Sequence, residues 1–192
     1  MASSVNNPED VVNLALAQMG FKSRIGSLYD GSMAAKAALT VYAQTRDAVL
    51  RANDWDFSEQ IAVAVLTGNA APAPWAYEYT YPVNCLKLRA LFGANYPTDM
   101  NNPIPSLWKI GNSVAGSGAE VIWSQVASAT LVFTAQVTKP SSWNAGFIEA
   151  FVSALALRLS ALLPSSVPPG DLIKANAEIA PSVIQTAASE IG

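Results

Sequence analysis

The sequence contains no histidine and only one cysteine, Cys85. Without histidine, the chain cannot assemble a Ser-His-Asp or Cys-His catalytic arrangement from its own residues. A single cysteine also excludes an internal disulfide and a zinc site built from several cysteines. We therefore expect a protein without catalytic residues of these kinds, without a metal and without a cofactor.

Charged residues are scarce. They make up 13% of the 192 residues, against roughly 25% in an average soluble chain. The net charge is −3, and the eleven Lys and Arg residues never form a run. Proteins that grip nucleic acid carry a basic stripe, so the sequence argues against specific DNA binding. A surface this poor in charge is often covered by partners, which predicts an oligomer.

Signals for membranes and secretion are also missing. The N-terminal "MASSVNNPED" has neither the basic start nor the apolar core of a secretory signal. The longest apolar stretch, residues 147–163, is interrupted by Glu149 and Arg158, so it does not indicate a membrane span. We expect a soluble protein made in a reducing cytoplasm.

Helical spacing marks both ends of the chain. A first helix is predicted from Pro8 to Gly20 and a second from Ser32 to about Ala52, each with capping residues at its start. Helical spacing returns over about 144–162, where apolar residues cover almost the whole circumference; such a helix is buried on several sides. A last helix is predicted over 172–191, kinked or divided by a proline at position 181.

Between the helices the apolar period changes to that of strands. Lys87 and Arg89 alternate with apolar neighbours, which predicts a strand with one wet face. The sequence therefore predicts an α+β fold, an antiparallel bundle of about four helices with a small antiparallel β lobe inserted between helices two and three. One domain is expected over 1–192, with helices in 1–57 and 141–192 and the lobe in 58–140. The predicted strands are 61–66, 86–90, 108–110, 120–123 and 131–137.

Three stretches resemble functional sites. Lys87, two residues after Cys85, would share its face in a strand and could lower its pKa, but the sequence favours a small buried apolar residue that leads into a strand. The segment "VAGSGAEV" (114–121) has two glycines but lacks the rest of a phosphate-binding pattern, so it predicts a hairpin turn. Asp54, Asp56 and Glu59 form the densest acidic group, which would suit general acid–base chemistry or a solvated helix end.

Aromatic residues at Trp75, Tyr77, Tyr79 and Tyr81 alternate strictly. In a strand they would share one face and could stack on bases, as in single-strand binders. The nearby acidic Glu78 and the lack of cations favour packing instead, against the helices or a neighbouring subunit.

Taken in order, these motifs resemble a known family. The segment from "ALAQMGFKSRIGSLYDGSM" to "RANDWDFS", the stretch "YTYPVNCLKLRAL" and the run "VFTAQVTKPSSWNAGFIEAF" are similar to head-to-tail connector adaptors of short-tailed bacteriophages, the tail tubular protein A family. The likeness covers most of the chain. The residues that carry it are Gly20, Ser27, Leu28, Tyr42, Arg46, Asp47, Trp55, Phe57, Tyr81, Pro82 and Cys85.

The resemblance implies a structural protein of the virion at the head-tail junction, not an enzyme. It implies a ring of about twelve copies that binds the portal protein and the tail nozzle or tail tube. Double-stranded DNA would pass through this ring without specific binding. No membrane and no cofactor are implied.

Two other classes of function stay open. A tail-associated cell-wall hydrolase would use carboxylates such as Asp54, Asp56 or Glu59. A single-strand nucleic-acid binding module would use the aromatic ladder from Trp75 to Tyr81.

Overall fold

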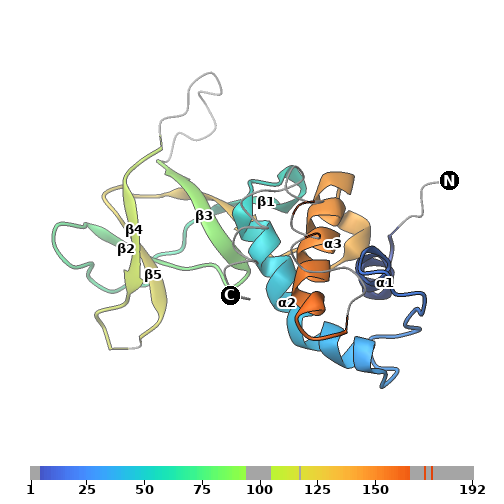
Figure 1. The fold of residues 1–192 in the computed structure, drawn as a ribbon. Coiled ribbons are helices and arrows are strands. Elements are labelled where there is room, and N and C mark those ends of the chain that lie inside the picture. Colours follow the sequence, from blue (N-terminus) through green and yellow to red (C-terminus); the bar gives the residue numbers. More distant parts are fainter. Residues whose placement is uncertain (1–4, 94–104, 117, 165–170, 172–173, 175–192) are drawn as a thin grey trace. The chain divides into compact units, whose positions relative to one another are not determined.

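A computed structural model of the chain describes residues 5–93, 105–116, 118–164, 171 and 174 (Figure 1). Its elements run in the order of two helices, six strands and a third helix, with two short 3-10 turns. The chain divides into two compact units. Unit 1 comprises Met1–Phe57 and Val137–Gly192, and unit 2 comprises Ser58–Gln136.

Unit 1 contains α1 (Pro8–Gln18), α2 (Met33–Ala52) and α3 (Ala145–Ser160). Their starts are capped as the sequence predicts: the Ser32 hydroxyl accepts from the Ala35 N–H at 3.2 Å, and Asn144 Oδ1 accepts from the Phe147 N–H at 2.8 Å. Figure 1 shows α3 beside both α1 and α2, in agreement with its contacts. The three predicted helices in this part of the chain are confirmed.

The core of unit 1 is built around α3. Ten of its residues are buried, and Phe147, Phe151 and Leu155 expose none of their surface. The prediction that this helix is buried on several sides is therefore correct. The Phe147 ring centroid lies 5.1–5.8 Å from four other rings. These belong to Trp55, Phe57, Trp143 and Phe151.

Unit 2 consists of two antiparallel sheets with three strands each, in the orders β1-β6-β3 and β2-β5-β4. Hydrogen bonds join the sheets at two corners. The Thr80 N–H donates to the Val65 carbonyl at 2.8 Å, and the Ser106 N–H donates to the Leu91 carbonyl at 2.7 Å. The sheets therefore form a partly closed barrel. Its strands are β1 (Glu59–Val63), β2 (Tyr77–Thr80), β3 (Cys85–Phe92), β4 (Trp108–Asn112), β5 (Glu120–Ser124) and β6 (Thr130–Ala135).

The α+β assignment is correct, but the predicted bundle of about four helices with a small β lobe is wrong. The described residues contain three helices and six strands in two sheets, and the strands enclose a core of their own. Alternation of apolar and polar residues predicts single strands. It does not predict that these strands pair into two sheets around a separate core. Apart from Lys174, the predicted fourth helix over 172–191 lies outside the described residues.

The predicted wet face of β3 is also wrong at Arg89. Two register shifts interrupt the pairing of β3 with β6, so the strand does not alternate regularly. Only 9% of the Arg89 side chain is exposed, and its guanidinium crosses the sheet. It donates to Thr134 Oγ1 at 2.8 Å and Glu59 Oε2 at 2.9 Å, and it reaches Ser58 Oγ at 3.2 Å.

Candidate functional site

The loop between α1 and α2 is held in place by side chains of α1. Asn13 forms a reciprocal pair with the backbone of Ile25, with distances of 2.9 and 3.1 Å. Glu9 accepts from the Leu28 N–H at 3.4 Å, and the Ser27 hydroxyl accepts from the Tyr29 N–H at 3.2 Å. Ser27 and Leu28 therefore shape the loop, which leaves Tyr29 82% exposed.

Gly20 ends α1 because it adopts a φ of 82°, in the left-handed region that glycine tolerates best. The Phe21 N–H then turns back to the Leu16 carbonyl at 2.9 Å. The predicted end of the first helix is correct to within two residues, since α1 ends at Gln18. Gly20 thus has a structural role in the chain.

The family-motif residues on and after α2 are mainly packing residues. The ring centroids of Tyr42 and Phe151 lie 5.1 Å apart. Burial raises the pKa of the Tyr42 hydroxyl, so the phenol stays neutral. Arg46 and Asp47 form an ion pair at 2.7 Å. The Trp55 indole N–H donates to the Val49 carbonyl at 2.9 Å, near the end of α2, and its ring packs with Phe57.

The stretch from Tyr81 to Cys85 forms the predicted turn into a strand. The Cys85 N–H donates to the Pro82 carbonyl at 3.0 Å, and Cys85 opens β3 opposite Ala135. Burial raises the pKa of the Cys85 thiol, and a register shift separates this residue from Lys87. The thiol therefore stays protonated at neutral pH and behaves as a small buried apolar group.

The aromatic ladder is not a base-stacking face. Tyr79 is fully buried, its hydroxyl donates to the Val126 carbonyl at 2.5 Å, and its ring stacks on Tyr77 with centroids 6.4 Å apart. Tyr77 and Tyr81 pack against the same core cluster between the two sheets. Their packing lies within unit 2 itself, whereas the sequence predicted packing against the helices or a neighbouring subunit.

The three residues of the predicted acidic group are divided between the two units. Glu59 in unit 2 is tied to Arg89 at 2.9 Å, while Asp54 and Asp56 belong to unit 1. Among the described residues, no cluster of three or more Cys, Asp or Glu side chains is arranged to hold a metal ion.

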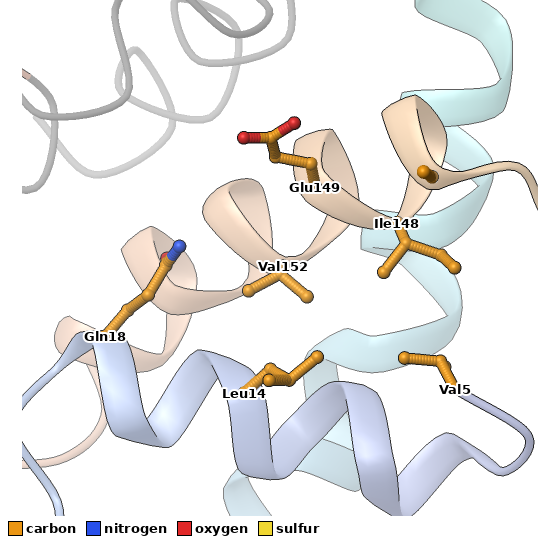
Figure 2. A pocket seen from close by; sticks show the side chains of 7 residues that line it. Val5, Leu14, Gln18, Ile148, Glu149 and Val152 are labelled. Carbon is orange, nitrogen blue, oxygen red and sulfur yellow. The ribbon is translucent and has the colours of Figure 1, made fainter. Parts of the chain in front are cut away.

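An apolar groove of about 340 Å³ lies between α1 and α3 (Figure 2). Figure 2 shows Leu14 of α1 facing Ile148 and Val152 of α3, with Gln18 and Glu149 at the polar rim. This volume is at the low end for small-molecule sites, and the groove offers a single carboxylate rather than an acid–base pair. Its chemistry is that of an apolar contact surface.

The most elaborate polar arrangement surrounds Glu78 on β2, a residue that sequence reasoning noted only as a neighbouring charge. The carboxylate is 1% exposed. Its Oε2 accepts from the Trp123 indole N–H at 3.0 Å. Its Oε1 accepts from Ser113 Oγ at 2.8 Å, Thr67 Oγ1 at 2.9 Å and Asn69 Nδ2 at 3.3 Å. The donors lie 9 to 45 residues away, so no local motif could reveal them.

Burial by itself raises the pKa of the Glu78 carboxyl. The hydrogen bonds from Trp123, Ser113, Thr67 and Asn69 together outweigh burial, so the pKa lies below its ordinary value. The carboxylate is therefore charged at neutral pH and saturated with donors. Such a group fastens the segments that carry Thr67, Asn69 and Ser113 to the sheet, and it is not an available general base.

Gly111 on β4 makes room for Trp123, which places the indole N–H against Glu78. A Cβ atom at position 111 would lie 2.3 Å from the Trp123 ring. Gly111→Ala is expected to displace the ring and to lower the free energy of unfolding by about 1 to 2 kcal/mol, as measured by urea denaturation. In a Trp123→Ala background the same substitution should be neutral, because the ring that it strikes is gone. An equal loss in both backgrounds would contradict this explanation.

No protein-family model matches the chain, and no curated protein matches it. Within the part of the chain that the structure describes, no helix has the length and apolar character needed to cross a membrane.

Proposed function

We propose that the chain is a structural head-to-tail adaptor of a bacteriophage virion, with no chemistry of its own. Its copies would form a ring, of about twelve subunits, that joins the portal protein to the tail tube and extends the DNA channel. The proposal starts from the ordered motifs that resemble tail tubular protein A. It places the protein in the virion, with DNA passing through the ring unbound.

The observation that carries the proposal is a set of exposed apolar side chains on a unit with few charges. Among the described residues of unit 2, Glu78 is buried, and Arg89 and Glu59 pair with each other. Large apolar side chains are nevertheless well exposed there. A surface with this composition is typical of one that is covered by other proteins. These side chains are Ile61, Val63, Val65, Leu66, Val83, Leu107 and Val114.

The test is assembly with the portal protein of the same phage. We expect a mixture of the two purified proteins to yield a ring-shaped complex of many copies, seen by particle imaging and by native mass measurement. Portal alone and the chain alone are the controls. A chain that stays free in the presence of its portal, at concentrations well above those of the particle sample, would overturn the adaptor proposal.

A further inference from the structure

The six strands of unit 2 are bonded to one another around the barrel. Ladders join β1 to β6 to β3 in one sheet and β2 to β5 to β4 in the other. Just after β1, the Val65 carbonyl accepts from the Thr80 N–H at 2.8 Å, which bridges the first corner. The Leu91 carbonyl accepts from the Ser106 N–H at 2.7 Å and bridges the second. Residues of unit 2 itself therefore complete the ring of strands.

Unit 2 also supplies its own core and the partners of its buried charges. The core cluster, in which Leu131 is 1% exposed, is built from residues of this unit. The four side chains that donate to Glu78 belong to unit 2, as do Glu59 and Thr134, to which Arg89 donates. Many domains of roughly 55 to 65 residues fold alone, and unit 2 is longer than that. It therefore has what a domain needs to fold by itself.

The two ends of unit 2 lie side by side. Glu59 is paired with Thr134 in the ladder between β1 and β6, and strands paired in this way are about 5 Å apart. The chain leaves unit 1 after Phe57 and returns to it at Val137. Domains with adjacent ends are the ones that a host fold accepts as inserts, because the insert takes the place of a short turn.

Unit 1 holds the same two junctions with its own side chains. The Phe147 ring centroid lies 5.2 Å from that of Phe57 and 5.1 Å from that of Trp143. The Trp143 indole N–H donates to the Val137 carbonyl at 3.0 Å. The aromatic cluster therefore joins the two pieces of unit 1 at the point where the barrel is inserted, and it does so with residues of unit 1.

We propose that the barrel of residues 58–136 is an independently folding insert, which stays folded when unit 1 opens. The chain then unfolds in two steps rather than one. The exposed apolar side chains of the barrel keep their arrangement while the helices open. This proposal does not rest on the adaptor function, because it concerns the free chain. Its tests contain no portal protein, so they can fail or succeed whether or not a ring forms.

Hydrogen exchange of the full chain, followed by mass spectrometry, measures opening segment by segment. Phe147→Ala should speed the slowest amides of α1 and α3 by at least about hundredfold, while those of β5 and β6 change by less than about threefold. Phe147→Leu should give the same pattern with a smaller rise. Leu162→Ala, at a side chain that is 51% exposed, is the control and should leave both units unchanged. Equal acceleration in helices and strands would overturn the proposal.

The reciprocal substitution lies in the core of the barrel. Leu131→Ala should speed the slowest amides of β5 and β6 by at least about thirtyfold, because it leaves a cavity between the sheets. The amides of α1 and α3 should keep their rates to within about threefold, since the barrel is still folded most of the time. Acceleration of the helices to the same extent would show that the chain opens as one cooperative unit.

Fluorine NMR of the full chain labelled with 5-fluorotryptophan gives a readout that does not depend on exchange. Trp55 and Trp143 report on unit 1, and Trp108 and Trp123 report on the barrel. During urea denaturation, Phe147→Ala should lower the midpoint of the first pair of signals and leave that of the second pair in place. A common shift of all four signals would refute independent folding.

Discussion

Replacement of Phe147 by alanine is expected to lower the free energy of unfolding by about 4 kcal/mol, the largest effect of any single substitution proposed for this chain. Phe147 exposes none of its surface, and its ring meets four other aromatic rings at centroid distances of 5.1–5.8 Å. Alanine would remove these contacts and leave a cavity that rigid neighbours cannot fill. Two tryptophans, Trp55 and Trp143, touch this ring, so tryptophan fluorescence during urea denaturation reports directly on the change.

Two matched variants show whether the loss comes from this packing. Phe147→Leu keeps most of the buried volume and should cost only about 1 kcal/mol. Leu162→Ala removes a side chain of similar size just after α3 that is 51% exposed, and it should change stability by less than about 0.5 kcal/mol. A Phe147→Ala protein within about 1 kcal/mol of the parent would show that the aromatic cluster does not hold unit 1 together.

The sequence predicted most single elements because each has a strong local signal. Asn144 lies just before a helix with apolar residues on nearly every side, and α3 begins one residue later. Leu131, Phe133 and Ala135 alternate with their neighbours, and all three belong to the core of unit 2. Capping chemistry and apolar period act over a few residues, so they can be read without the rest of the fold.

What the sequence could not predict depends on contacts between distant residues. The Arg89 guanidinium reaches Glu59, 30 residues away, and two register shifts in β3 turn it from the expected wet face into the sheet. Trp123 reaches Glu78 across 45 residues, in space that Gly111 leaves free. These pairings follow from how the strands combine into two sheets, and the periodicity of a single strand does not specify that combination.

Glu78→Gln is expected to lower the free energy of unfolding by about 3 kcal/mol at neutral pH. The carboxylate accepts four hydrogen bonds through two oxygens, one from Trp123 and three from Ser113, Thr67 and Asn69. An amide has one acceptor oxygen and one NH2 group. In either orientation the NH2 group meets a donor, and the negative charge that strengthens all four bonds is lost.

The loss of stability in Glu78→Gln should also depend on pH, in a direction that the pKa of Glu78 determines. The folded-state pKa of Glu78 lies below its ordinary value, so the charged carboxylate stabilises the folded state above the unfolded pKa of about 4.3. This stabilisation is lost as the pH falls through the lower, folded-state pKa. The gap in stability between the parent protein and Glu78→Gln should therefore be full at pH 7 and shrink steadily below about pH 4.

Urea denaturation of both proteins across this pH range measures the gap. Glu120→Gln, at an exposed carboxylate on the neighbouring strand β5, is the matched control and should follow the parent at every pH to within about 0.5 kcal/mol. A gap of the same size at pH 3 and pH 7 would mean that shape rather than charge holds Glu78 in place. If no gap appeared at neutral pH, the four donors would not fasten their segments to β2.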